Sequence, residues 1–427
     1  MLNAESMKYN IPTVHVIGAG MAGLSAALQL TLMGMRVHVH ESAPYAGGRC
    51  RSYFDRGLDC RIDNGNHLVL SGNVAVQDYL ELSGAEHTIN KAPEPLFPFM
   101  DIKTHERWIV HMNKGRIPWW IFDKDRRVKG SKPMDYLSGL RLLFPGEETK
   151  VASRLNAKTL LYRRLWEPLA VSALNTELSA ASAKLLSNIM DQSFASGGRA
   201  CCPMIPKIGL SETFVQPCLE TIQKHGAEIS YGQRLRKIEA TPEGKVTALH
   251  FAKESIKLGK NDWVVLAVPA WVAKELIPDL PAPDSFRSIT NLHYRVEAPS
   301  SPVGFTGLIG GLAEWAFVHP GTVSVTISCA DRYDEPDNAK WAIAVWDDLA
   351  ALFDLDRTKV PPYCLIREKR ATFAATPAQD RMRPRAYIGW KNLALAGDWT
   401  ATELPSTIEG ALRSGTKAAE VVMRWKE

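Results

Sequence analysis

The feature that most constrains this chain is an uncharged stretch near its start, from Val16 to Met35. It is long enough to span a bilayer as one helix, so a membrane span is the first possibility to weigh. Three glycines interrupt its first half, however, and a short, mostly β-branched segment at 14–17 leads into them. We therefore predict a strand over 14–17, a turn, a helix over 21–33 and a second strand over 36–40.

The interrupting glycines, Gly18, Gly20 and Gly23, fit the pattern G-x-G-x-x-G. In this pattern the first glycine permits a tight turn, the second lets the backbone approach a pyrophosphate, and the third lets the helix pack on the strand. The positive end of the helix then faces the phosphates. Glu41 ends the second predicted strand, close to the spacing of about 20 residues expected for an acid that binds ribose. These residues predict a dinucleotide site, and a glycine turn that merely packs two elements is the alternative.

The composition excludes several other classes of protein. The chain has 427 residues, of which 45% are hydrophobic and 23% charged, as in a soluble globular protein with more than one lobe. A formal net charge of +5 is too small to indicate nucleic-acid binding. The seven cysteines contain no C-x-x-C pair, so we predict no disulfide scaffold and no metal site. A reducing, cytoplasmic compartment fits this cysteine usage, and no secretory signal is recognisable.

The order of the predicted elements suggests one domain assembled from separated segments. Residues 10–75, 205–270 and 386–427 carry strand, glycine-turn and helix patterns, and we predict that they form this domain. Residues 76–204 are expected to be mostly helical, and 271–385 to be mixed. We predict that these two segments form a second, inserted domain.

Further motifs carry a resemblance to a known superfamily. Gly47-Gly48-Arg49 follows Glu41, the segment 262–269 reads as a buried strand, and Gly397-Asp398-Trp399 precedes a C-terminal helix. Together, in this order, they resemble the flavin-containing amine oxidases and carotenoid desaturases. The resemblance implies an α/β fold: a GR2-type Rossmann-like domain that binds FAD, with a discontinuous inserted α+β domain for the substrate. No cysteine lies between 365 and 427, where some amine oxidases attach their flavin, so FAD is expected to be non-covalent.

The resemblance also implies roles for particular residues. Gly48 and Arg49 would approach pyrophosphate or ribityl oxygens, Arg49 through its forked guanidinium. Asp398 would accept hydrogen bonds from ribityl hydroxyls, and the helix near Ile408 would point its positive end at the flavin. The backbone of Leu235 would contact adenine. A surface arginine, a turn aspartate, a plain C-terminal helix and a core leucine are the structural alternatives.

The segment Asp63-Asn64-Gly65-Asn66-His67 resembles the superfamily's loop beside the flavin ring. Gly65 would allow the backbone to approach the ring closely, and Asn66 would lie next to it. His67 is the candidate catalytic residue, because a histidine near a flavin could give a proton to a leaving hydroxyl. A hydrogen-bonded structural histidine is the alternative.

Residues of the inserted region narrow the resemblance to one branch of the superfamily. Trp166-Glu-Pro-Leu169, followed by Ala173-Leu174-Asn175, resembles the hydroxysqualene dehydroxylase branch, to which the short chain length also corresponds. This branch implies reduction of hydroxysqualene to squalene, with hydride passing from flavin N5 to an allylic cation, in bacterial squalene and hopanoid biosynthesis. Trp166 would line a dry pocket for the cation, or else belong to a structural helix seam. A phytoene- or carotenoid-type desaturase, an amine oxidase and a flavin-free prenyl-lipid carrier remain open, and the sequence identifies no electron donor.

An apolar isoprenoid substrate would have to come from a membrane. About thirty apolar carbons at ~0.8 kcal/mol each put transfer into water roughly 20 kcal/mol uphill. Trp119, Trp120 and Phe122 lie among basic residues, a composition that suits an anionic bilayer surface. We therefore expect peripheral contact with the inner face of the cytoplasmic membrane. A strand of the inserted domain followed by a solvated basic loop is the alternative.

Overall fold

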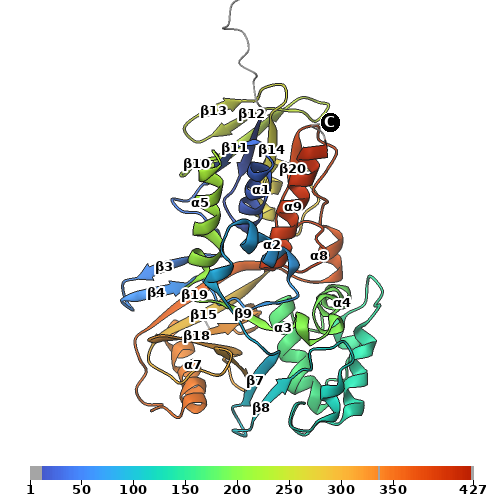
Figure 1. The fold of residues 1–427 in the computed structure, drawn as a ribbon, viewed down its shortest axis with the longest axis vertical. Coiled ribbons are helices and arrows are strands. Elements are labelled where there is room, and N and C mark those ends of the chain that lie inside the picture. The colour runs from blue at the N-terminus through green and yellow to red at the C-terminus, as the bar shows by residue number, and fades with distance from the viewer. Residues whose placement is uncertain (1–11, 335–336, 425–427) are drawn as a thin grey trace, which may run out of the picture.

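A five-stranded parallel sheet forms the centre of one lobe in the computed structural model, which describes residues 12–334 and 337–424 (Figure 1). Its strand order is β10-β2-β1-β14-β20. The strands come from three distant parts of the chain: β1 (Thr13–Ile17), β2 (Arg36–His40), β10 (Glu228–Ser230), β14 (Trp263–Leu266) and β20 (Leu393–Leu395). These strands lie within the three segments predicted to form one domain, although the proposed domain boundaries stay a prediction.

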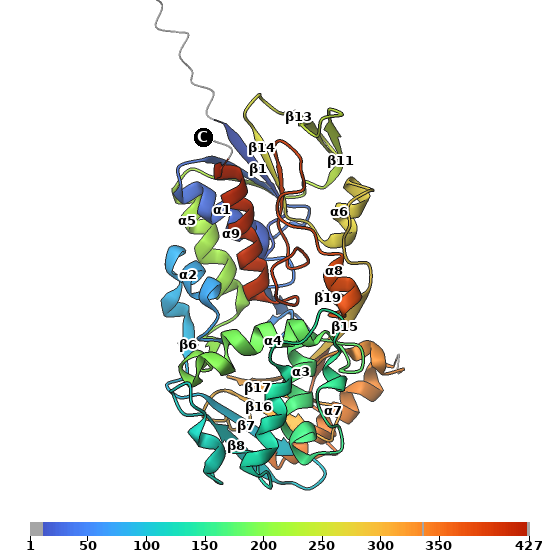
Figure 2. The same cartoon turned by 90° about the vertical axis from the view of Figure 1, so that its right-hand side faces the viewer.

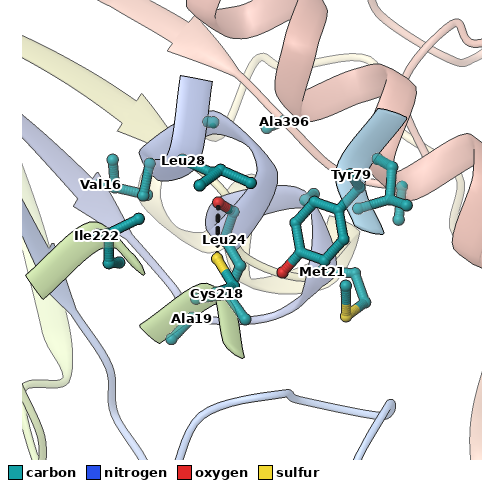
Figure 3. Close-up of a cluster of buried hydrophobic side chains, with 14 of the residues drawn as sticks. Val16, Ala19, Met21, Leu24, Leu28, Tyr79, Cys218, Ile222 and Ala396 are labelled. Carbon is teal, nitrogen blue, oxygen red and sulfur yellow. Dashed lines mark hydrogen bonds between the residues drawn. The ribbon is translucent and has the colours of Figure 1, made fainter. Parts of the chain in front are cut away.

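The uncharged stretch at 16–35 is the end of β1 and the helix α1 (Met21–Leu32), so the predicted strand–turn–helix–strand is confirmed. Helix α1 packs on the sheet and contacts both α5 (Gln216–Lys224) and α9 (Ile408–Arg424). Figure 3 shows Leu24 and Leu28 of α1 among Val16, Cys218 and Ile222. A helix that is apolar all round is one buried on all sides, which explains the absence of charge. In the described part of the chain, no helix is both long and apolar enough to cross a membrane.

The other face of the parallel sheet is covered by a three-stranded antiparallel sheet of β11 (Leu235–Ala240), β12 (Val246–Phe251) and β13 (Ser255–Lys257). Figure 2 shows the layers side-on, with α5, α1 and α9 on one side and β11 and β13 on the other. The lobe therefore has three layers, and the predicted Rossmann-like α/β class is confirmed.

The second lobe is built on a seven-stranded mixed sheet with the order β19-β15-β18-β17-β16-β7-β8. Helix α7 (Asn338–Phe353) packs on this sheet through a cluster of buried side chains. The sheet's strands are β7 (Leu96–Asp101), β8 (Arg107–His111), β15 (Phe286–Arg295), β16 (Phe305–Ile309), β17 (Trp315–His319), β18 (Thr322–Ile327) and β19 (Tyr363–Phe373).

Residues 76–204 differ in part from the expectation of mostly helical structure. They do contain α3 (Glu167–Leu174) and α4 (Ala183–Gln192), but also β7 and β8 and the short strands β6 (Ile89–Lys91) and β9 (Pro203–Pro206). β6 and β9 are short and pair with each other although they lie far apart in sequence, so no local pattern marks them. The hairpin of β7 and β8, whose strands are neighbours in sequence, was also missed.

Short elements connect the two lobes. The hairpin of β3 (Ser52–Asp55) and β4 (Cys60–Asp63) follows the first βαβ unit, and β5 (Val69–Leu70) pairs with β9. Helix α2 (Val74–Leu82) contacts α9, and α6 (Ala270–Leu276) contacts β11. Helix α8 (Pro377–Arg381) follows β19 in the sequence.

Candidate functional site

The glycine turn between β1 and α1 has the geometry of a phosphate cradle. Gly18 has φ +107°, and a Cβ placed on it would lie 2.5 Å from the carbonyl oxygen of Ala267. A Cβ on Gly23 would lie 1.9 Å from the oxygen of Gly18, so Gly23 sets the close packing of helix on strand. Gly20 differs, because nothing lies within 4 Å of its Cβ position, and as N-cap of α1 it offers no side-chain cap. The turn therefore leaves open space in front of the helix N-terminus, where a phosphate fits.

Glu41 closes this turn from the end of β2. Its buried carboxylate accepts hydrogen bonds from the N–H of Ala19 (2.7 Å) and the N–H of Ala43 (2.8 Å). Its backbone oxygen accepts from the N–H of Gln233 (2.8 Å), which brings the segment leading into Leu235 alongside. The ribose-binding candidate and the adenine-contact candidate are thus near neighbours, although they lie far apart in sequence.

The Gly47-Gly48-Arg49 turn packs directly on the cradle. The N–H of Gly47 donates to the oxygen of Ala19 (2.8 Å), and a Cβ on Gly48 would lie 3.3 Å from the Cα of Gly20. Gly48 also has φ +57°, a conformation that glycine adopts without strain. Arg49 forms an ion pair with Asp398 (Nη2 to Oδ2, 2.7 Å) and also donates to the backbone oxygen of Ala371.

The turn that carries Asp398 is held from several sides. The indole of Trp399 occupies the space where a Cβ of Gly397 would be, and the N–H of Gly397 donates to the hydroxyl of Ser414 (2.8 Å). The buried guanidinium of Arg383 donates to the backbone oxygens of Asp398 (3.3 Å) and Thr400 (2.5 Å). Sequence reasoning missed Arg383, because no local motif marks a residue that acts on a turn many positions away.

The C-terminal helix α9 begins at Ile408, as predicted for the helix that would face the flavin. Glu409, next to it, accepts hydrogen bonds from the N–H groups of Ala75 (3.1 Å) and Val76 (3.0 Å) at the start of α2. This carboxylate therefore caps a second helix and ties α2 to α9.

The loop at 63–67 lies between the lobes and is held by the seven-stranded sheet. Asn66 donates to the hydroxyl of Thr326 (3.1 Å), and Asn291 donates to the backbone oxygen of Asn64 (3.4 Å). A Cβ on Gly65 would lie 2.9 Å from Nδ2 of Asn291, so a larger residue here would displace the Asn291 side chain. Neither Thr326 nor Asn291 was predicted, since each lies in the middle of an ordinary-looking strand.

His67 is half-buried beside Arg49, and the structure gives little support to the catalytic role predicted for it. Burial, together with the positive charge of Arg49, lowers the pKa of His67 to about 4. The imidazole is therefore neutral near pH 7 and lacks the extra proton that a general acid donates.

Asp63, at the start of the same loop, has the opposite tendency. Burial raises its pKa to about 6, even though its carboxylate accepts from the hydroxyl of Ser52 (2.5 Å) and the N–H of Leu210 (3.0 Å). It borders a cavity of about 320 Å³ between the hairpin β3–β4 and the seven-stranded sheet. The residues that line the cavity include several with polar side chains, namely Asp63, Asn66, Lys207, His293, His319 and Ser324.

Trp166 is partly buried and packs at a seam between helices. The six-membered ring of its indole lies 2.8 Å from the Cβ position of Gly139. Asn175, at the end of the same block, donates to the hydroxyl of Thr372 (2.9 Å) and accepts from the N–H of Cys329 (2.5 Å). These contacts favour the structural interpretation of the block, and Trp166 does not border the cavity described above.

Trp119, Trp120 and Phe122 form a short 3-10 helix, η2 (Trp119–Phe122), so the alternative of a strand is wrong. Trp119 and Phe122 are each 63% exposed, whereas Trp120 is 6% exposed and packs edge-on against Tyr136. The prediction that Trp120 faces a membrane is therefore also wrong, because neighbouring positions on one helical turn point to different sides.

Comparisons with known proteins agree with the nucleotide site that this geometry indicates. Residues 21–423 match the family model described as flavin containing amine oxidoreductase. The chain is 42% identical over 410 residues to a hydroxysqualene dehydroxylase of Sinorhizobium fredii, covering 96% of this chain and 98% of the relative. It is 40% identical over 409 residues to a hydroxysqualene dehydroxylase of Zymomonas mobilis, with the same coverage. Among solved structures, an oxidoreductase from Methanosarcina mazei superposes with a TM-score of 0.70 at 15% identity, covering 96% of this chain and 100% of that one.

Proposed function

This chain belongs to the hydroxysqualene dehydroxylase family of flavin-containing amine oxidoreductases, and on that premise we propose that it reduces hydroxysqualene to squalene. The observation that carries the proposal is the 42% identity over 410 residues, which extends across both lobes rather than the nucleotide-binding segments alone. A probable zeta-carotene desaturase of Synechococcus elongatus covers the same 96% of this chain but is only 21% identical.

The residues around the glycine turn fit non-covalent FAD. Gly20 leaves room for the pyrophosphate at the start of α1, Glu41 and the backbone near Leu235 would hold the adenosine, and Arg49 and Asp398 would hold the ribityl or pyrophosphate part. When bound and reduced, FAD supplies the hydride of the reaction. The chain's own residues have to bind and orient the cofactor, exclude water and provide a proton for the leaving hydroxyl.

Asp63 is the residue that we assign to this proton, in place of His67. Asp63 borders the cavity, and its pKa of about 6 leaves part of the population protonated near neutral pH. In the proposed step the allylic C–O bond breaks while Asp63 protonates the departing oxygen, so that water leaves and Asp63 becomes a carboxylate. The hydrogen bonds from Ser52 and Leu210 then stabilise the carboxylate.

The cavity suits the reacting end of the substrate rather than its whole length. Its volume of about 320 Å³ lies at the lower end of the range for small-molecule sites. The polar lining of the cavity can hold a hydroxyl group. Asn66, which belongs to the 63–67 loop beside the proposed flavin position, is one of the lining residues.

Peripheral membrane contact forms part of the same proposal. Between residues 117 and 144 the surface exposes seven large apolar side chains, and Phe144 is 95% exposed. Exposed cations, including Arg116, Lys124 and Arg141, share this segment. Apolar side chains flanked by cations favour insertion into an anionic bilayer surface. The apolar set is Ile117, Trp119, Phe122, Met134, Leu137, Leu140 and Phe144.

An anaerobic single-turnover experiment tests the reaction. Protein loaded with FAD and photoreduced should reoxidise on addition of hydroxysqualene and release squalene in stoichiometric amount. A desaturase would instead reduce oxidised FAD on addition of phytoene, and an amine oxidase would release peroxide with amines in air. Purified protein that takes up no FAD would support the prenyl-lipid carrier and contradict the proposal.

A further inference from the structure

Three histidines gather on the face of the parallel sheet that lies opposite α1. Val14, Val16, Val37 and Val39 point into the cluster beneath α1, so the alternate residues of β1 and β2 point to the other face. His15 pairs directly with His38 across the two strands, and His40 follows two positions later. On this side the ring of His40 stacks on Phe251 of β12, with 4.8 Å between the ring centroids.

The ring nitrogens are close enough to share one ion. Nδ1 of His15 lies 3.1 Å from Nε2 of His40, and one nitrogen from each of the three rings lies within 4.8 Å of the others. A tetrahedral zinc ion with bonds of about 2.0–2.1 Å separates its ligand nitrogens by about 3.3 Å. The first pair is already at this spacing. His38 needs to approach by a side-chain rotation, and it is the most exposed ring of the three.

The state of the rings also suits metal binding. His15 and His40 are 5% and 1% exposed, and Nδ1 of His15 shares with Nε2 of His40 a hydrogen bond that a bound ion would replace. Within the described residues, Nδ1 of His40, the ring nitrogen that does not contact His15, is buried without a hydrogen-bond partner, so the contact with His15 is the one hydrogen bond that this ring makes. A buried polar atom without a partner costs free energy that an apolar side chain of similar size would not.

We propose that His15, His38 and His40 bind one divalent transition-metal ion of the zinc type, a site unrelated to the proposed redox reaction. Neutral imidazoles favour zinc and its neighbours in the first transition row. Glu228, whose carboxylate lies 4.0 Å from Nδ1 of His38, or a water molecule would complete the ligand set. Ions can enter past His38, because the adjacent β10 is the edge strand of the sheet.

The site would brace the nucleotide turn from behind. His40 directly precedes Glu41, and its backbone oxygen accepts from the N–H of Gly18 (2.8 Å). A metal ion bound to β1 and β2 together would hold these two strands in register beneath the adenosine end. The three ligands come from two strands and none of the familiar ligand spacings, which explains why the sequence analysis predicted no metal site.

The test uses untagged, FAD-loaded protein that has been treated with a chelator and then titrated with Zn²⁺ or Co²⁺ alone. We expect one equivalent of metal per chain, the visible d–d bands of a tetrahedral Co²⁺ centre, and a higher Tm with Zn²⁺. His38→Ala should weaken Co²⁺ binding by more than the roughly 10–100-fold typical for loss of an outer-shell partner. The exposed His225, changed to alanine, is the matched control and should bind as the wild type does.

Two results would overturn the proposal. One is wild-type protein that binds no stoichiometric Co²⁺, and the other is His38→Ala protein that binds as well as wild type. If His38→Ala does not fold, His38→Gln keeps a polar side chain of similar size and serves in the same titration. The metal readouts do not depend on squalene formation, so they remain informative even if the proposed function fails.

Discussion

The guanidinium of Arg49 donates to the carboxylate of Asp398 across 2.7 Å, joining two residues that are 349 positions apart. Each had been assigned to FAD separately, and the structure brings them together where the first and last segments of the nucleotide-binding lobe meet. Arg49 also donates to the oxygen of Ala371 on β19, a strand of the other lobe. One side chain thus connects the proposed cofactor site to the seven-stranded sheet.

Replacing Arg49 by lysine should weaken FAD binding while the protein still folds. Lysine keeps the charge but loses the planar fork that reaches two acceptors at once. A hydrogen bond to a charged group contributes about 1.5–3 kcal/mol, so we expect Kd for FAD to rise roughly tenfold to a hundredfold. Flavin fluorescence quenching measures this Kd. The same change at the exposed Arg385 is the control, and equal affinities in both variants would contradict the assignment.

The glycines of the cradle separate folding from cofactor binding. Gly20→Ala should leave the Tm of FAD-free protein within a few degrees of wild type, because its Cβ position is open and its φ of −76° suits alanine. FAD affinity should fall about tenfold or more, since the new methyl group would occupy space in front of the helix N-terminus.

Gly23→Ala is the contrasting variant. Its methyl group would collide with the oxygen of Gly18 at 1.9 Å, so overpacking should cost ~1–3 kcal/mol or more of folding stability. Thermal unfolding followed by circular dichroism separates the two effects. If Gly20→Ala protein binds FAD as well as wild type does, the phosphate does not bind at this position.

Asp63 should make stability depend on pH in a defined direction. Because burial raises its pKa from 3.8 to about 6, the folded chain prefers the protonated form. Its contribution is therefore complete below about pH 4 and is lost as the pH rises through about 6. The shift corresponds to ~3 kcal/mol at most.

Asp63→Asn removes this dependence because an amide does not ionise. Relative to wild type, the variant should gain up to ~3 kcal/mol of unfolding free energy between about pH 4 and about pH 7, measured by urea unfolding. It should also lose most of the squalene-forming activity if Asp63 supplies the proton. Asp59→Asn is the control, since Asp59 is exposed in a left-handed conformation that asparagine tolerates. Full activity in Asp63→Asn would show that another residue supplies the proton.

Membrane binding should depend on Trp119 and Phe122 but not on exposed apolar residues elsewhere. The double change of Trp119 and Phe122 to serine removes apolar area worth about 1.5–3 kcal/mol per side chain. We expect partitioning onto phosphatidylglycerol vesicles to fall by more than about tenfold in a co-sedimentation assay. Ile343→Ser on α7, at a 53% exposed position, is the control. Unchanged sedimentation of the double variant would rule this segment out as the docking surface.

The sequence by itself determined the nucleotide-binding turn. Gly18, Gly20 and Gly23 act through local sterics, and the helix after them lacks charge because it is buried on all sides. A short window of sequence therefore shows both the glycine pattern and the uncharged helix. The strand at 36–40 and the C-terminal helix were predicted for the same reason, because the residue patterns that mark them are local.

Only the tertiary structure decided which side chains meet. The pairing of Arg49 with Asp398, the support of the 63–67 loop by Asn291, and the grouping of His15 with His38 and His40 all depend on strand register and lobe packing. The contrast between buried Trp120 and exposed Trp119 has the same origin. Two adjacent tryptophans are equally apolar, so the sequence does not distinguish them. Burial stabilises the fold through the tryptophan whose side chain points toward the core from its position on the helix.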